Sequence, residues 1–441
     1  MSKKTLTEAF DIKKDKNVIK DIKDYEIFKD KTLLDNLRVK IVQNLIDLNI
    51  PDDTMLLEYI NEEINNTLEG YDLTSLERSH VFGLIQNEIT GYGPITDMLE
   101  DDTITEIMVN GPNDIYVEVD GKIKKDESVS FINDEHIVRT IQRMVQPLGR
   151  TIDAANPMVD ARLRDGSRLN AIIAPLSLKG PVLTIRKFRK DLDGVDDLLI
   201  KGTMTIHMAK FLEACVKAKL NVIISGGTGT GKTTLLNILS SFIGSDERII
   251  TIEDAAELKL HQNHVISLET RLVNYEGSGE VTIRDLVRNS LRMRPDRIIV
   301  GEVRGKEAFD MLQAMNTGHE GSLTTLHANS PHDALNRLET MMLMNDMELP
   351  VNAIRGYIEN AIDIIVQIDR MSDGKRKITS ISEVAGMKDN EIVLKEIFAF
   401  KQKGVAEDNS VMGEFIIHKT KPLVYNKILR QGINEIEDLF N

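Results

Sequence analysis

The chain has 441 residues, of which 41% are hydrophobic and 28% charged, a composition typical of a folded protein with two or three domains. The formal net charge of −15 disfavours nucleic acid as the main partner, because phosphate binding needs a basic face. The single cysteine, Cys215, excludes a disulfide framework and a cysteine-ligated zinc module. The sequence lacks both a signal-peptide core and a run of about 18 apolar residues. We therefore expect a cytoplasmic protein without direct membrane insertion, which associates with a membrane only through partners.

The N-terminal part of the chain is predicted to be helical. Residues 1–30 are rich in Lys and Asp, and we expect a mobile or solvated segment there. Apolar residues recur at three- and four-residue steps over 32–48, and further helices are predicted over 54–68 and from the capping box Thr74-x-x-Glu77 to Gly91. These patterns indicate a helical domain over 31–99, for packing or partner docking.

Strand-like segments begin near residue 103. The segments 104–109 and 115–119 are predicted strands, Asp120-Gly121 is a predicted hairpin turn, and a helix is expected at 134–146. A second hairpin at Asp165-Gly166 and a strand at 182–188 complete a small α+β domain over 100–190.

The second half of this domain is rich in arginine. Arg162 and Arg164 are expected on a solvated face. Arg168 and Arg186 lie within strand-like segments, where a long cation needs an anion to face. These two arginines are therefore candidates for binding an anion.

The segment 191–205 is acidic and interrupted by Gly194 and Gly202, and it is the predicted linker. From residue 206 to 441, strands and helices alternate as in a parallel sheet. Helix starts are predicted at Thr205, Thr282 and Ser330-Pro331. The last hundred residues or so suggest further helices and short strands without assigned chemistry.

The most specific motif lies between a β-branched run at 222–225 and an apolar helical pattern. Its sequence GGTGTGKTT fits G-x-x-x-x-G-K-[ST], the P-loop that binds the phosphates of a nucleotide triphosphate. Glycines let backbone N–H groups turn toward the phosphates, Lys232 would reach the β- and γ-phosphates, and the Thr233 hydroxyl would hold Mg²⁺. The predicted nucleotide-binding residues are Gly227, Thr228, Gly229, Thr230, Gly231, Lys232, Thr233 and Thr234.

Two acids follow predicted strands that should end at the same edge of the sheet as the P-loop. Glu253 follows the strand at 248–252, and Glu302 follows Gly301 at the end of the strand at 297–300. Because ligands bind at the carboxyl ends of parallel strands, these acids are candidates for orienting or deprotonating the attacking water and for holding Mg²⁺ through its water shell. Structural capping of loops is the alternative role of a single strand-end acid.

His319 and His327 flank the strand predicted at 322–326, and we expect both on the phosphate side. The lack of nearby cysteines or a clear carboxylate set disfavours zinc. Sensing of the γ-phosphate region is the favoured role, and core packing or capping is the alternative.

Together these motifs resemble a known family. The segments GGTGTGKTT, TIEDAAEL, RIIVGEVRG and TGHEGSLTTLHANS are similar to the Walker A, Asp box, Walker B and His box of the type II/type IV secretion-system ATPases. Further segments, among them DARLRDGSRLNAIIAPLS and LRMRPDRIIVGEVRG, resemble the Tad/Flp pilus assembly branch. The resemblance extends from about Glu77 to the C-terminus, and the chain lacks the four-cysteine zinc insert of other branches.

The resemblance implies a RecA-like P-loop NTPase domain, preceded by a small α+β (PAS-like) domain and the N-terminal helical domain, in an α/β fold. It also implies a homo-oligomer, a hexameric ring that closes on ATP and Mg²⁺. The motif positions assign Glu253 as general base, Glu302 as the Walker B acid that holds Mg²⁺ through water, and His319 and His327 as the His box. Arg168 and Arg186 correspond to arginines that approach the phosphates, and such arginines can contribute about 10³ to 10⁵ in rate.

We therefore expect an ATP-hydrolysing motor that assembles, and in some systems retracts, a Tad/Flp-type pilus at an inner-membrane platform protein, with no nucleic acid partner. An ATPase of a type IV secretion system that exports DNA or protein is the alternative within the superfamily. A nucleotide-gated scaffold with little turnover is the alternative outside it. A GTPase switch is disfavoured, because the sequence lacks the N-K-x-D motif that recognises guanine.

Overall fold

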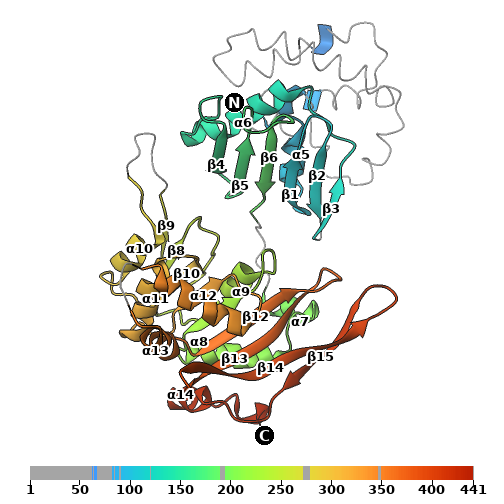
Figure 1. Ribbon diagram of the computed structural model, residues 1–441. Helices are drawn as coiled ribbons and strands as arrows, with labels where there is room; N and C mark the ends of the chain where they lie inside the picture. Colours follow the sequence, from blue (N-terminus) through green and yellow to red (C-terminus); the bar gives the residue numbers. More distant parts are fainter. Residues whose placement is uncertain are drawn as a thin grey trace, which may run out of the picture. The chain divides into compact units, whose positions relative to one another are not determined.

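The computed structural model describes residues 62, 64–66, 82–83, 85–88, 91–119, 121–188, 194–271, 279–345 and 349–440. The chain divides into two compact units, Met1–Arg189 and Lys190–Asn441 (Figure 1). The helix predicted over 32–48 lies outside the described residues, and the described parts of the next two predicted helices are helical. The finer division of residues 1–99 stays a prediction. No helix in the described ranges is long and apolar enough to cross a bilayer.

The first unit contains a six-stranded antiparallel sheet in the order β3-β2-β1-β6-β5-β4. Asn133 caps helix α6 by accepting a hydrogen bond from the His136 backbone N–H, and buried residues of α6 such as Ile137 and Ile141 share one core with the sheet. The predicted strands, hairpins and helix of this region are confirmed. The elements are η4 (Gly93–Ile95), α5 (Thr96–Glu100), β1 (Ile104–Val109), β2 (Ile115–Val119), β3 (Lys122–Lys125), α6 (Asp134–Val145), η5 (Gln146–Leu148), β4 (Met158–Arg162), β5 (Arg168–Ile172) and β6 (Val182–Arg186).

The second unit is built on a nine-stranded sheet in the order β15-β14-β13-β12-β7-β11-β10-β8-β9. From β12 to β9 the strands are parallel, and from β12 to β15 they are antiparallel. The strands are β7 (Val222–Ser225), β8 (Ile249–Glu253), β9 (Val265–Glu269), β10 (Arg297–Val303), β11 (Leu323–Leu326), β12 (Ile364–Arg370), β13 (Arg376–Lys388), β14 (Glu391–Val405) and β15 (Val411–Ile417).

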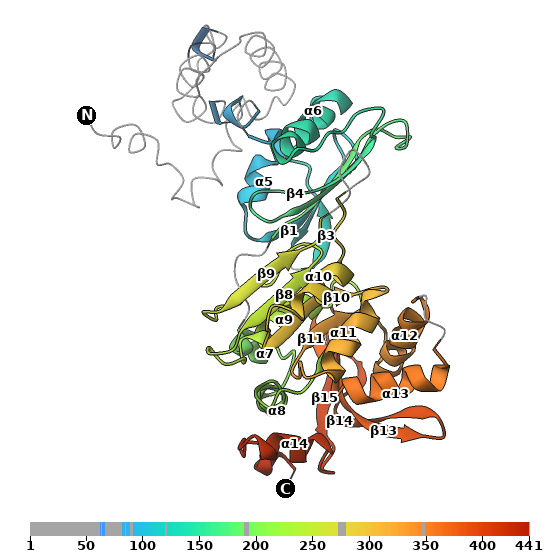
Figure 2. The same cartoon turned by 90° about the vertical axis from the view of Figure 1, so that its left-hand side faces the viewer.

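Helices cover both faces of this sheet. Val222 and Ile224 of β7 pack in one core with α8, α9 and α14, whereas Ile223 packs in a second core with α10 to α13. Figure 2 shows α11, α12 and α13 on one side of the strands and α8 and α9 on the other. The helices are α7 (Val195–Ile200), α8 (Ile206–Lys217), α9 (Lys232–Ser240), α10 (Ile283–Ser290), α11 (Glu307–Asn316), α12 (Pro331–Leu343), α13 (Val351–Ala361), α14 (Val424–Arg430) and η6 (Glu437–Leu439). Cys215 of α8 is buried in the first of these cores.

The predicted helix starts are confirmed by their caps. Each capping hydroxyl accepts a hydrogen bond from the backbone N–H three residues later. The pairs are Thr205 with Met208, Thr282 with Asp285, and Ser330 with Asp333. Thr282 and Asp285 form a full capping box.

Two predictions for this part of the chain were wrong in detail. The segment 191–205 is not linker throughout, because Val195–Ile200 forms α7 and buries Leu198 in the core. The C-terminal strands are not short: β13 has 13 residues and β14 has 15. Cross-strand pairing along this antiparallel ladder stabilises a length that local propensity does not reveal.

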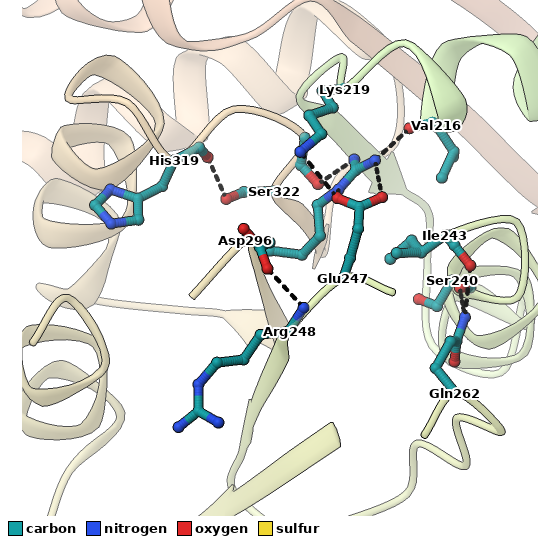
Figure 3. A network of polar contacts seen from close by, with 12 residues as sticks. Val216, Lys219, Ser240, Ile243, Glu247, Arg248, Gln262, Asp296, His319 and Ser322 are labelled. Carbon is teal, nitrogen blue, oxygen red and sulfur yellow. Dashed lines mark hydrogen bonds and ion pairs between the residues drawn. The ribbon is translucent and has the colours of Figure 1, made fainter. Parts of the chain in front are cut away.

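A buried arginine joins the amino ends of several elements of the second unit. Arg297, the first residue of β10, has a fully buried side chain that pairs with both carboxylate oxygens of Glu247, at 2.8 and 3.1 Å. It also donates to the carbonyls of Val216 in α8, at 2.9 Å, and of Gly321 before β11, at 3.1 Å. The ammonium of Lys219 lies 3.0 Å from the same Glu247 carboxylate (Figure 3). The starts of β10 and β11 are thereby fixed to α8.

Candidate nucleotide-binding and active site

The P-loop connects β7 to α9 in the second unit, as predicted. Gly226 must be a glycine, because a Cβ there would lie 2.3 Å from the Ile368 carbonyl oxygen of β12. Gly229 and Gly231 have φ values of 71° and 96°, which side chains other than glycine rarely adopt. The loop backbone and the N-terminus of α9 thus form the kind of site that binds phosphate.

Lys232 is the first residue of α9, and only 7% of it is exposed. Its ammonium donates to the Gly227 carbonyl at 2.8 Å and lies 3.3 Å from His327 Nε2. Thr230 donates to the same carbonyl at 3.0 Å. The predicted residues Gly227 to Thr234 therefore form one connected loop and first helical turn, with Thr233 and Thr234 half-buried in that turn.

Glu253 ends β8 and is almost fully buried, with 3% exposure. Its carboxylate accepts hydrogen bonds from the backbone N–H groups of Glu257, at 2.9 Å, and Leu258, at 3.1 Å. These donors fix the orientation of the carboxylate and stabilise its negative charge. Gly301 lies so close to it that a Cβ there would be 2.9 Å from Glu253 Cγ, which explains why a glycine separates Glu302 from the apolar part of β10.

Glu302 lies within β10 rather than after it, because the strand extends to Val303. One carboxylate oxygen accepts a hydrogen bond from the Arg304 guanidinium at 2.6 Å, and the other lies 3.0 Å from His327 Nε2. Arg304 was not among the predicted site residues, although it belongs to the RIIVGEVRG segment. Arg304 lies also 3.7 Å from Asp254, so it connects the ends of β8 and β10.

His327 lies between the P-loop lysine and the acid of β10. Its Nε2 atom is 3.3 Å from Lys232 Nζ and 3.0 Å from Glu302 Oε1. Burial and the nearby Lys232 cation lower the pKa of His327 below its ordinary value of 6.5, against the opposing influence of Glu302. The lowered pKa favours the neutral imidazole, whose ring nitrogen can accept a hydrogen bond from Lys232.

The predicted position of His319 was wrong. His319 precedes β11 and His327 follows it, and β11 is parallel to β7. His319 therefore lies at the amino end of the strand, at the opposite end from the P-loop. There its carbonyl accepts a hydrogen bond from the Ser322 hydroxyl at 2.9 Å (Figure 3).

Arg168 and Arg186 lie on neighbouring strands of the first unit. They are direct cross-strand partners of β5 and β6. Arg186 also lies opposite Glu106 of β1, and the opposite charge of this carboxylate offsets part of the repulsion between the two arginines. Their approach to a bound nucleotide stays a prediction.

Arg376, the first residue of β13, was not among the predicted site residues. Its Nε–H donates to the Gly229 carbonyl at 3.1 Å, so a residue far along the chain contacts the P-loop directly. The surrounding DGKRK segment predicts a turn, but no motif in it indicates a nucleotide.

A magnesium site at the P-loop would use the donors that the sequence predicts. The Thr233 hydroxyl and the Glu302 carboxylate are hard oxygen ligands, which Mg²⁺ prefers. Among the described residues, no group of three or more His, Cys, Asp or Glu side chains is arranged to hold a metal on its own. The donor chemistry fits Mg²⁺ that arrives with the nucleotide phosphates.

Comparison with known proteins identifies the family. The family model described as "Type II/IV secretion system protein" matches residues 88–435. A putative conjugal transfer protein of Mycobacterium tuberculosis is 36% identical, over 68% of this chain and 86% of the relative. The type IV secretion system protein VirB11 of Bartonella henselae is 31% identical, over 66% of this chain and 92% of that relative. Among solved structures, the VirB11 ATPase of Brucella suis matches at 28% identity, with a TM-score of 0.37 over 66% of this chain and 95% of that one. The chain belongs to the type II/IV secretion system protein family.

Proposed function

We propose that the second unit hydrolyses ATP at the P-loop, with Glu253 as the base that activates the attacking water. One observation carries this proposal: His327 Nε2 lies 3.3 Å from Lys232 Nζ and 3.0 Å from Glu302 Oε1. These contacts bring together the carboxyl ends of β7, β11 and β10. Glu253 ends the next strand, β8, so four neighbouring parallel strands supply the site.

Each side chain has a distinct role in this proposal. Lys232 neutralises the β- and γ-phosphates, and the backbone N–H groups of Gly227 to Thr234 bind the phosphate chain. Thr233, and Glu302 through water, would hold Mg²⁺, which would supply charge neutralisation on the phosphates. His327 accepts from Lys232 and lies beside Glu302, so it senses whether the γ-phosphate has drawn the lysine away. His319, at the other end of β11, has no part in these steps.

We further propose that the active form is a homo-oligomer, a hexameric ring in which Arg168 and Arg186 complete the site. Support comes from the motif resemblance, in which arginines at these positions approach the phosphates. An arginine that reaches the phosphates only on closure would couple hydrolysis to movement.

The ring would power a pilus or secretion machine at the inner face of a membrane, through a platform protein. The Tad/Flp motif resemblance favours pilus assembly. The conjugal transfer and VirB11 relatives favour export of DNA or protein at least as strongly. The net charge of −15 favours a protein over DNA as the molecule that the motor itself contacts.

The test is the ATPase rate against protein concentration, with mass determined in parallel, for wild type, Arg168→Ala and Arg186→Ala. Arg164→Ala, which removes an exposed arginine from the β4–β5 turn, is the matched control. The proposal expects specific activity to rise as a hexamer-sized species forms, and at least one of the two strand arginines to be required for hydrolysis but not assembly. Lys232→Ala, Glu253→Gln and Glu302→Gln should each abolish turnover. An ATPase rate that is independent of protein concentration and of both arginines would contradict the hexameric ring. Wild-type turnover no higher than that of Glu253→Gln would favour the alternative of a nucleotide-gated scaffold.

A further inference from the structure

We propose that Arg376 binds the nucleoside part of the nucleotide, so that the β12–β13 hairpin forms the base and ribose side of the site. This inference rests on the proposed ATP site and names a residue that lies outside its phosphate-binding motifs.

The hairpin packs directly on the P-loop. Strand β12 pairs with β7 in parallel, with Gln367 opposite Ser225, which places Ile368 beside Gly226. A Cβ on Gly226 would lie 2.3 Å from the Ile368 carbonyl oxygen, and one on Gly231 would lie 3.2 Å from Arg376 Cδ. The side chain of Arg376 therefore lies across the glycines that precede α9.

The order of the strands indicates which end of the nucleotide meets the hairpin. β11 and β10 lie on one side of β7, and β12 lies on the other. The amine of Lys232 faces His327 at the end of β11, so the β- and γ-phosphates belong on that side. A nucleotide that extends across the P-loop from this side must place its ribose and base on the β12 side, where Arg376 lies.

The turn that presents Arg376 is well anchored. The Asp373 carboxylate accepts hydrogen bonds from the backbone N–H groups of Lys375 and of Val411 in β15, both at 3.0 Å. Arg376 itself is half-buried, and its Nε–H donates to the Gly229 carbonyl at 3.1 Å. The planar face of the guanidinium can stack on a base, and its positive charge attracts the ribose and base oxygens.

Direct binding measurements separate this role from simple bracing of the P-loop. The probes are MgATP, MgADP and magnesium tripolyphosphate, which keeps the phosphate chain but has no nucleoside. Arg376→Ala should weaken the binding of MgATP and MgADP by about ten- to a hundredfold, because a stacking contact and a charged contact to the nucleoside are lost. The affinity for tripolyphosphate should change less than about twofold. Arg376→Lys keeps the charge but not the planar face, and it should show most of the same loss.

Lys375→Ala is the matched control, because it removes a 61% exposed cation from the same turn. It should leave all three affinities unchanged. An equal loss of affinity for MgATP and tripolyphosphate in Arg376→Ala would show that Arg376 only stabilises the P-loop. Unchanged affinity for both would show that Arg376 has no role in binding. Either result overturns the inference. Failure of the wild type to bind MgATP would instead refute the proposed function. Lys232→Ala should lose affinity for all three ligands, which would show that they bind at the P-loop.

Discussion

Replacement of Arg297 by Met tests whether the buried network at the amino end of the sheet stabilises the second unit. The substitution keeps a long, flexible apolar side chain but removes every donor of the guanidinium. Glu247 would lose both hydrogen bonds from Arg297 and keep Lys219, while the carbonyls of Val216 and Gly321 would each lose a donor.

The expected loss is about 3 to 5 kcal/mol, the range for breaking a buried ion pair by removing one partner. The Val216 carbonyl keeps a hydrogen bond from the Lys219 backbone N–H, at 3.1 Å, so the Gly321 carbonyl is the one that loses its donor. Lys219 compensates part of the Glu247 charge, and this gain offsets the loss at Gly321, so the net expectation stays at about 3 to 5 kcal/mol. For a unit of this size, that loss corresponds to a fall in Tm of roughly 6 to 20 °C.

Thermal unfolding of the full chain, followed by circular dichroism, measures this loss. Lys217→Met, which removes an exposed i,i+4 pair with Glu213, is the control and should cost about 0 to 1 kcal/mol. Burial opposes ionisation of Glu247, but the hydrogen bonds and charge of Arg297 and Lys219 outweigh it and lower the Glu247 pKa below its ordinary 4.5. The pair therefore stabilises the fold above pH 4.5 and loses this effect as the pH falls, so the gap between wild type and Arg297→Met should narrow toward pH 4. A gap no larger than that of Lys217→Met, or one that does not depend on pH, would refute the reasoning.

Two further predictions concern the site. Gly226→Ala places a methyl group 2.3 Å from a backbone oxygen and should destabilise the protein by about 1 to 3 kcal/mol. Gly227→Ala is the control and should change the Tm little, because its Cβ would lie 3.7 Å from the nearest atom. Equal shifts in Tm for the two variants would contradict this account. His327→Gln should lower kcat by about ten- to a hundredfold, because one hydrogen bond to a charged group is altered. We expect the wild-type rate to fall below pH 6.5 as His327 becomes protonated, and His327→Gln to lack this fall. An unchanged acid limb in His327→Gln would show that another group titrates there.

The parts of the fold that repeat a local pattern could be predicted from the sequence. The cap residues Thr205, Thr282 and Ser330 marked helix starts correctly, because an N-cap is satisfied by its own neighbours. The full length of β13 and β14 could not be predicted, because it depends on pairing between strands. The helix α7 was missed because its glycine-flanked acidic sequence resembles a linker, and only the burial of Leu198 distinguishes it.

The same distinction holds for the site. A compact motif predicted the P-loop, and the parallel strand rule brought Glu253, Glu302 and His327 to one edge. The rule also excludes His319 from that edge, since it precedes the strand that His327 follows. The contact of Arg376 with Gly229 joins residues 147 positions apart, and it depends on which strand lies next to β7.

The single cysteine has a practical consequence for experiments on movement. Cys215 is completely buried in α8, and burial raises the pKa of its thiol well above the ordinary value. A buried, protonated thiol reacts poorly with maleimides. Cysteines introduced at exposed positions of each unit should therefore accept fluorescent or spin labels selectively without prior removal of Cys215. Distances between two such labels, measured with and without nucleotide, would test whether the separation of the two units changes when nucleotide binds.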